Sequence, residues 1–90
     1  MEISFDPAKR ALTLAERGLD FADAARVFGE PEFTFEDTRF DYPEPRFATY
    51  GMLDGRLVAV IWTETARGRR IISMRKANGR EQARYAKRLG

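Results

Sequence analysis

The chain has 90 residues, of which 43% are hydrophobic and 12% aromatic, and its net charge is +2. A chain of this length buries only about 60 to 65% of its unfolded surface, so we expect one two-layer domain spanning residues 1–90. It contains no cysteine and no histidine, which excludes disulfides, thiolate nucleophiles and the usual zinc and haem ligands. We therefore expect neither a metal site nor a cofactor.

Charge is distributed unevenly along the chain. Residues 1–55 hold 12 acidic and 6 basic residues, whereas residues 56–90 hold 2 acidic and 10 basic residues. Such segregation favours a surface for a polyanion, and the alternative is that the two halves neutralise each other in the fold. The N-terminal residues lack a signal-peptide pattern and no apolar run reaches about 18 residues, so we expect a cytoplasmic protein without a membrane span.

Two helices are predicted after a short strand at Glu2 to Phe5. Asp6-Pro7 combines a capping carboxylate with a proline suited to the first helical turn, which predicts a first helix ending at about Arg17. A second helix is predicted after Asp20, because apolar residues follow at helical spacing. This apolar stripe consists of Phe21, Ala24, Ala25 and Phe28.

Strand signals dominate the middle of the chain. Glu32 to Asp37 alternates polar and apolar residues as an exposed edge strand does, and a loop is predicted from Thr38 to Pro45. The strands Arg46 to Leu53 and Arg56 to Thr65 are joined by Asp54-Gly55, a strong signal for a two-residue hairpin turn. That turn sets a register in which Tyr50 lies opposite Ala59 and Phe47 lies opposite Trp62.

A last strand, Arg70 to Lys76, and a last helix, Gly79 to Leu89, complete the chain. Asn78 and Glu81 have the spacing of a capping box at the start of this helix. The predicted fold is α+β: two N-terminal helices pack on an antiparallel β-sheet, and a C-terminal helix follows it.

The register of the last two strands assigns side chains to the two faces of the sheet. If Thr65 pairs with Arg70, the apolar face lies under the N-terminal helices and carries Ala48, Tyr50, Met52, Leu57, Ala59, Ile61, Ile72 and Met74. The other face is more polar and carries Phe47, Thr49, Trp62, Glu64, Ser73 and Arg75. A shallow surface that presents cations and an aromatic ring suits RNA, through phosphate contacts and base stacking.

Cleavage of RNA requires proton transfers and a cation that stabilises charge developing on the phosphate. The candidates for charge stabilisation are Arg46, Arg75 and Lys76, and those for proton transfer are Glu64 and Tyr85. The candidates for binding RNA are Arg70, Trp62, Arg80 and Arg84. Plain structural interpretations compete with these roles: Trp62 as a core residue, Glu64 as the partner of an arginine, and Arg80 and Arg84 as a solvated helix face.

Motifs in a specific order extend over nearly the whole chain. They are Phe5-Asp6-Pro7-Ala8-Lys9; Phe21, Ala24, Ala25 and Phe28; Asp41-Tyr42; Arg46-Phe47; Gly51; Arg56-Leu57-Val58; Thr63; Arg70-Ile71-Ile72-Ser73-Met74-Arg75-Lys76-Ala77; Glu81; and Tyr85. In order and spacing, this set resembles the BrnT toxins of bacterial type II toxin–antitoxin systems, which are placed among the RelE-like ribonucleases.

This resemblance implies a RelE-like α+β fold and metal-independent cleavage of RNA that inhibits translation. It also implies neutralisation by a BrnA-like antitoxin, whose ribbon-helix-helix part binds operator DNA. Arg46, Arg75, Lys76 and Tyr85 fall on matching positions of the family. Family members often carry histidine where this chain has Arg17 and Phe40. The alternative is therefore a non-catalytic RNA-binding or co-repressor subunit that binds an antitoxin.

Overall fold

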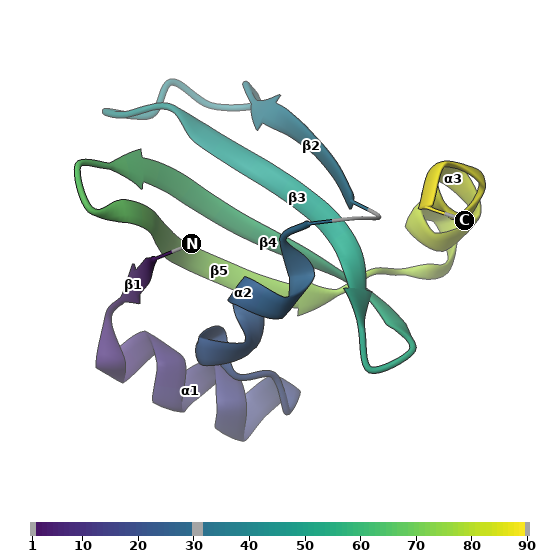
Figure 1. The fold of residues 1–90 in the computed structure, drawn as a ribbon, viewed down its shortest axis with the longest axis horizontal. Helices are drawn as coiled ribbons and strands as arrows, with labels where there is room; N and C mark the ends of the chain where they lie inside the picture. Colours follow the sequence, from purple (N-terminus) through teal and green to yellow (C-terminus); the bar gives the residue numbers. More distant parts are fainter. Residues whose placement is uncertain (1, 30–31, 90) are drawn as a thin grey trace.

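A computed structural model describes residues 2–29 and 32–89, except for the side chains of residues 86, 88 and 89. The chain forms a five-stranded sheet with the strand order β1-β5-β4-β3-β2 (Figure 1). The strands are β1 (Ile3–Phe5), β2 (Glu32–Asp37), β3 (Arg46–Leu53), β4 (Arg56–Thr65) and β5 (Gly68–Lys76). The helical segments are α1 (Pro7–Arg17), a 3₁₀ turn (Phe21–Asp23), α2 (Ala24–Val27) and α3 (Gly79–Leu89).

The sheet is mixed, so the prediction of two N-terminal helices packed on an antiparallel sheet is wrong. β1 pairs with β5 in parallel, whereas the other neighbouring strands are antiparallel. The parallel pairing brings the backbone of Glu2 against the start of β5, where the Arg69 N–H donates to the Glu2 carbonyl at 3.1 Å. Gly68, with φ of 120°, leaves room for this close approach.

The N-terminal helical layer is thinner than predicted. α1 has the expected cap at its start, with Asp6 accepting from the Ala8 N–H at 2.9 Å, and Gly18 ends it in the left-handed conformation, yet α1 buries none of its residues fully. The predicted second helix is only a 3₁₀ turn followed by the single-turn α2. Val27 is buried there while Ala25 is exposed, because the change of helical pitch rotates the apolar stripe.

The predicted β3–β4 hairpin is confirmed in its bounds and its register. Phe47 lies opposite Trp62, and Tyr50 lies opposite Ala59. Asp54 and Gly55 have φ values of 51° and 78°, which is the left-handed turn geometry that matches the twist of the two strands.

The register between β4 and β5 differs from the predicted one and places the second half of β5 on the opposite face. The N-terminal helices also cover the face of Phe47 and Trp62, not the predicted face of Tyr50 and Ala59. Thr65 pairs with Gly68, not with Arg70, and a β-bulge follows at Ile61 and Trp62. A shift of one residue moves every side chain of a strand to the other face. As a result, Arg75 lies beside Ala59, on the face that was expected to be the helix-covered core.

The two faces have separate hydrophobic clusters. The face under α1 and α2, here called the core face, buries Leu19, Phe21, Ala24, Val27, Leu53, Val58, Val60, Trp62, Ile71 and Met74. The opposite face, here called the α3 face, buries Ala48, Tyr50, Leu57, Ala59, Ala77 and Tyr85. Figure 1 shows α3 on its own beside the sheet, away from α1 and α2. α3 therefore covers only part of its face.

Gly68→Ala is expected to destabilise the fold more than Gly29→Ala. Both glycines have similar positive φ values, 120° and 127°, so both variants carry a backbone strain of about 1 to 3 kcal/mol. Only at position 68 would a new Cβ meet a backbone atom, the Glu2 carbonyl oxygen, at 2.2 Å. Urea unfolding measures the difference in free energy of unfolding, and equal losses in the two variants would contradict the close β1–β5 pairing.

Candidate functional site

Three side chains lie in one row across the α3 face. The strand registers place Tyr50 of β3 beside Ala59 of β4, and Ala59 beside Arg75 of β5. Alanine at the middle position is small, so the two long side chains meet above it: Arg75 Nη2 donates to the Tyr50 hydroxyl at 3.2 Å. The sheet thus fixes a guanidinium and a phenol side by side.

Glu81, in the first turn of α3, completes this arrangement. Arg75 Nη1 and Nη2 donate to the two carboxylate oxygens of Glu81 at 2.7 Å each, and the Tyr50 hydroxyl donates to Oε2 at 2.5 Å. Glu81 also accepts from the Asn78 N–H at 3.0 Å, while Asn78 Oδ1 accepts from the Glu81 N–H at 2.9 Å. The predicted capping box is therefore confirmed, and its carboxylate also holds Arg75.

These contacts fix the charge states of the three groups. The hydrogen bonds from Arg75 are the main cause that lowers the pKa of Glu81 to about 2. Burial, followed by the hydrogen bond to Glu81, raises the pKa of Tyr50 to about 12. The pKa of Arg75 is raised, chiefly by its hydrogen bonds to Glu81. Near neutral pH the site therefore contains a guanidinium, a carboxylate and a neutral phenol.

An aromatic cluster supports this polar group. The Tyr85 ring of α3 stacks on the Tyr50 ring with a centroid distance of 4.4 Å, and Phe33 of β2 lies 5.2 Å from Tyr85. Phe35 stacks on Tyr50 at 6.0 Å. The contact between α3 and the edge strand β2 thus consists largely of aromatic rings.

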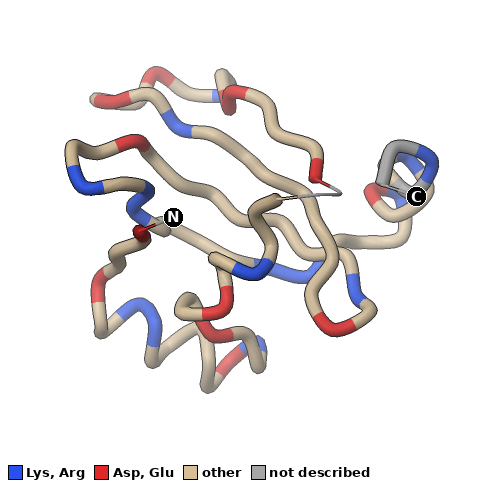
Figure 2. The backbone as a smooth tube through the Cα atoms, viewed as in Figure 1, with Lys and Arg blue, Asp and Glu red and all other residues tan. Residues whose placement is uncertain are grey.

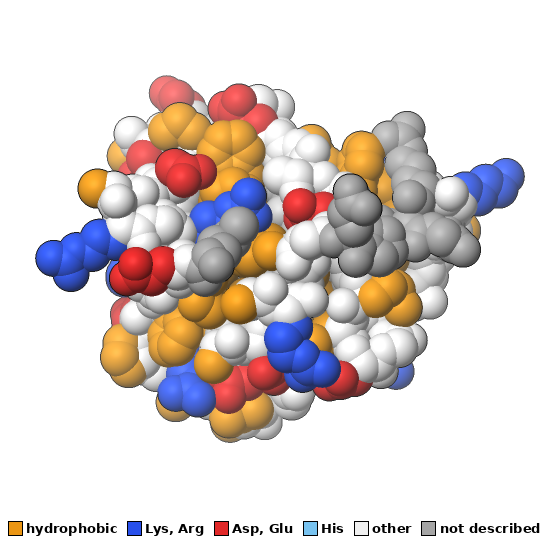
Figure 3. Space-filling view, in the orientation of Figure 1, with side chains coloured by type: hydrophobic (Ala, Val, Ile, Leu, Met, Phe, Trp, Pro, Cys, Tyr) orange, Lys and Arg blue, Asp and Glu red, His pale blue; other side chains and the backbone are white. Residues whose placement is uncertain are grey.

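A hollow of about 340 Å³ opens above this group. It is lined by Phe35, Glu36, Asp37, Thr38, Arg39, Ala48, Tyr50, Ile61, Arg75, Glu81, Arg84 and Tyr85. The lining includes three arginines and three carboxylates, with aromatic and aliphatic side chains between them. Figure 2 shows the two signs of charge interspersed along the fold, and Figure 3 shows charges of both signs on one surface. With three arginines and three carboxylates in its lining, the hollow itself is locally balanced in charge, not uniformly basic.

A second polar network borders the same hollow. Asp37 is buried and accepts from Arg39 Nε and Nη2 at 2.9 and 3.0 Å, and from the Tyr42 hydroxyl at 3.1 Å. The hydrogen bonds from Arg39 are the main cause that lowers the pKa of Asp37 to about 2. Arg46 lies over the Tyr42 ring at 4.2 Å, and its buried Nε has no hydrogen-bond partner within the described part of the chain.

The predicted site residues divide between the two faces. Arg75, Arg84 and Tyr85 line the hollow, while Arg46 lines a neighbouring hollow formed by the loop between β2 and β3. Arg70 and Arg80 are exposed, the first on β5 and the second in the first turn of α3.

Three predicted residues lie away from the hollow, on the core face. Trp62 is buried among the core residues, and its Nε1 donates to Thr49 Oγ1 at 2.8 Å. Glu64, two residues further along β4, is exposed on that side of the sheet. Lys76 pairs with Val58 and lines a separate hollow beside Leu19.

The sequence prediction did not assign Tyr50 and Glu81 to the site. Tyr50 was expected to be a residue of the helix-covered core, and Glu81 only a helix cap. Both would have been identified by the correct β4–β5 register, because Arg75 then lies beside Tyr50 and within reach of the capping carboxylate. The β-bulge at Ile61 and Trp62, which sets this register, has no clear sequence signal.

The described residues contain neither a long apolar helix nor a cluster of side chains of the kind that binds a metal ion. None of their helices combines the length and the apolar character needed to cross a membrane. Residues 2–29 and 32–89 also contain no group of three or more histidine, cysteine, aspartate or glutamate side chains arranged to hold a metal ion.

Glu81→Gln is expected to lower the free energy of unfolding at pH 7 by about 1.5 to 3 kcal/mol, since it removes hydrogen bonds between charged groups. The pKa of Glu81 is about 2 in the folded protein, below its ordinary value of 4.5. The stabilisation is therefore complete above about pH 4.5 and is lost as the pH falls towards 2. Urea unfolding between pH 7 and pH 2 should show that the difference in free energy of unfolding between wild type and Glu81→Gln becomes smaller as the pH falls.

Glu16→Gln, at an exposed position of α1, makes the same chemical change away from the hollow and serves as the control. A difference between wild type and Glu81→Gln that stays constant from pH 7 to pH 2 would show that the Glu81 carboxylate does not stabilise the fold through Arg75.

Comparison with known proteins identifies the family. Residues 5–81 match the family model described as the ribonuclease toxin, BrnT, of type II toxin–antitoxin systems. No curated protein matches the chain. The matched range covers most of the sequence and contains Arg75, Tyr50 and Glu81, the three residues that form the polar centre of the hollow. The chain therefore belongs to the BrnT family of ribonuclease toxins of type II toxin–antitoxin systems.

Proposed function

We propose that the hollow on the α3 face is the site at which this toxin cleaves RNA, with Arg75 as the central residue. The main observation behind this proposal is that Arg75 lies in the open hollow while Tyr50 and Glu81 hold its guanidinium in place. Its side chain is 38% exposed, so it is fixed and still accessible. A positioned guanidinium of this kind binds phosphate and stabilises charge that develops on it.

The proposed reaction is internal transesterification of RNA. The 2′-oxygen attacks the phosphorus, which forms the new O–P bond, and the bond from phosphorus to the 5′-oxygen breaks. Water accepts the proton of the 2′-hydroxyl, and a donor in the hollow gives a proton to the departing 5′-oxygen and recovers one from water, while negative charge accumulates on the non-bridging oxygens. A fixed cation close to these oxygens lowers the barrier by stabilising that charge.

Each group in the hollow has a role suited to its contacts. Within the described residues, Arg75 uses three of its five N–H groups on Glu81 and Tyr50, which leaves two for phosphate. Arg84 adds a second cation, and the Tyr85 hydroxyl is the candidate donor to the 5′-oxygen. Glu81, with a pKa of about 2, is a weak base and positions Arg75.

The remaining candidates have different roles in this proposal. Arg46, Arg70 and Arg80 serve as contacts to the RNA backbone around the hollow. Lys76 and Glu64 are left out of the reaction because their side chains lie on the core face. Trp62 is left out as a stacking platform because it is buried beneath α1 and α2.

The finer features of the activity follow from the resemblance to BrnT toxins. We propose that cleavage is metal-independent, that it inhibits translation in the cytoplasm, and that a BrnA-like ribbon-helix-helix antitoxin neutralises the toxin. Contact with operator DNA would then be made through the antitoxin. The chemistry supports metal independence, since guanidinium groups supply the positive charge that a metal ion supplies in other nucleases.

Arg75→Ala is expected to reduce RNA cleavage by about 100- to 1,000-fold, the loss typical of removing one donor to a developing oxyanion. Purified toxin free of antitoxin is incubated with messenger RNA in excess EDTA, and the cut fragments are quantified. Arg56→Ala removes the same side chain from an exposed position beside the hairpin turn and should leave the rate within about two-fold of wild type.

Cleavage that disappears in EDTA would contradict the metal-independent mechanism. Cleavage that survives Arg75→Ala would remove Arg75 from the centre of the site. A wild-type protein that binds RNA without cutting it, and leaves growth unaffected on expression, would favour the non-catalytic subunit.

One observation favours the alternative function, a non-catalytic subunit that binds RNA or an antitoxin: the chain contains no histidine. At the two positions where family members often carry it, the Arg17 guanidinium donates to the Met74 carbonyl at 2.9 Å and Phe40 lies exposed in the loop between β2 and β3. Neither residue transfers protons.

A further inference from the structure

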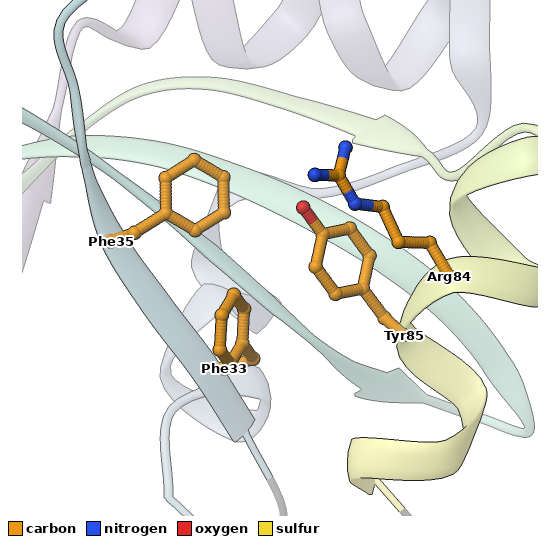
Figure 4. Close-up of a pocket in the computed structure, with 4 residues that line it drawn as sticks. All are labelled: Phe33, Phe35, Arg84 and Tyr85. Atoms are coloured by element: carbon orange, nitrogen blue, oxygen red, sulfur yellow. The ribbon is translucent and has the colours of Figure 1, made fainter.

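A second hollow, of about 330 Å³, adjoins the first at the edge of the sheet. It is lined by Phe33 and Phe35 of β2 and by Arg84 and Tyr85 of α3. Figure 4 shows the three rings around a common space, with the Arg84 side chain extended alongside Tyr85. Phe35, Arg84 and Tyr85 also line the hollow that contains Arg75, so the two hollows are neighbours with three residues in common.

Three rings at the two hollows, those of Phe35, Tyr50 and Tyr85, are nearly parallel, whereas the Phe33 ring is tilted by 51° from Phe35 and by 34° from Tyr85. Phe35 makes an interplanar angle of 14° with Tyr50 and of 21° with Tyr85, and Tyr50 and Tyr85 lie at 28° to each other. Phe35 remains 37% exposed although it is a large apolar side chain on the edge strand β2. An exposed ring held by its neighbours presents a flat face on which another planar group can stack.

A cation completes the lining. The Arg84 guanidinium lies 5.8 Å from the Tyr85 ring centroid, and no carboxylate pairs with it among the residues that the structure describes. Arg84 can therefore stack on a planar ligand or bind the phosphate next to it. Aromatic faces combined with an unpaired arginine are the features by which proteins hold single-stranded nucleic acid.

We propose that this second hollow binds one unpaired nucleobase of the RNA, next to the phosphate held at Arg75. This inference rests on the proposed RNA cleavage, and it adds that the substrate is single-stranded RNA. A base stacked within a duplex cannot enter the hollow, so the toxin selects single-stranded RNA. The nucleotide whose base stacks on Phe35 adjoins the bond that is cut, because the two hollows share three lining residues.

The favoured occupant is a base and not a side chain of the antitoxin. A hydrophobic side chain would gain little from Arg84, whereas a nucleotide has both a flat base for the rings and an adjacent phosphate for the guanidinium. The lining shared with the Arg75 hollow also matches the short spacing between a base and the phosphate of its own nucleotide.

The test is a double-mutant cycle between the protein and the RNA. A single-stranded oligonucleotide carrying a 2′-deoxy sugar at the cut site binds without being cleaved, and a set of copies each replaces one base with an abasic sugar. Wild type should lose about 5- to 150-fold in affinity for one abasic copy adjacent to the cut site. Phe35→Ala should lose a similar factor for the intact oligonucleotide, with less than about two-fold further loss for that copy.

Matched variants separate stacking from folding defects. Leu12→Ala removes another large exposed apolar side chain, 58% exposed and outside both hollows, and should bind as wild type does. Phe35→Leu keeps the apolar bulk but removes the ring, so it should show most of the loss while unfolding at a urea concentration close to that of wild type.

The outcomes distinguish this proposal from the proposed function. If wild type cleaves RNA but binds every abasic copy equally, or cuts duplex as fast as single strands, the nucleobase site is wrong while the nuclease assignment stands. If Phe35→Ala weakens only the antitoxin complex, the second hollow belongs to the protein partner and the proposal is overturned. If wild type neither binds nor cuts RNA, both fail.

Discussion

The ion pair between Arg75 and Glu81 connects the end of the sheet to the helix that follows it. Only two residues, Ala77 and Asn78, separate β5 from α3, and Glu81 lies in the first turn of that helix. One carboxylate therefore caps the helix, accepts both guanidinium hydrogen bonds and accepts the Tyr50 hydroxyl. The direction in which α3 leaves the sheet depends on this contact, and so does the position of Tyr85, one turn further along.

This coupling explains how a small domain can hold an exposed cation rigidly. A free arginine on a strand has many rotamers, and ordering it on binding costs conformational entropy. Here the two hydrogen bonds to Glu81 and the one to Tyr50 order Arg75 before any ligand arrives. The cost is that the carboxylate occupies one edge of the guanidinium, so a phosphate must approach through the remaining N–H groups. Positioning and partial neutralisation of Arg75 are thus two consequences of the same contact.

Local sequence signals predicted two helix caps and a hairpin turn, but not how the elements combine. The Asp6 cap of α1, the Asp54-Gly55 turn and the capping box of α3 each depend on a few neighbouring residues, and all are found where predicted. The mixed sheet and the face that carries Arg75 depend on pairings between distant strands. Within β5, one bulge residue decides the face, and no composition or periodicity signal marks it.

The same reasoning explains which site residues the sequence could identify. Arg75 and Tyr85 were found from their chemistry and their match to the family pattern, which need no knowledge of the fold. Tyr50 and Glu81 have ordinary structural roles in isolation, a strand aromatic and a helix cap. They become functional candidates only when three strands and one helix bring them into contact.

In the part of the chain that the structure describes, the acidic and basic halves do not neutralise each other through ion pairs, although the hollow itself is balanced in charge. Each ion pair within the described residues joins two members of the same half of the chain, as in Arg10 with Asp20 and Arg75 with Glu81. Among the residues that the structure describes, the excess of basic residues after residue 55 is therefore not cancelled by direct pairing with the acidic half. Such a field acts over about a Debye length and attracts polyanions, whereas paired groups and aromatic rings act at contact distance and would orient the RNA of the proposed reaction. Salt should consequently weaken the capture of RNA more than it disturbs the geometry of Arg75, because the ion pair that holds Arg75 is partly buried and less screened than exposed charges are.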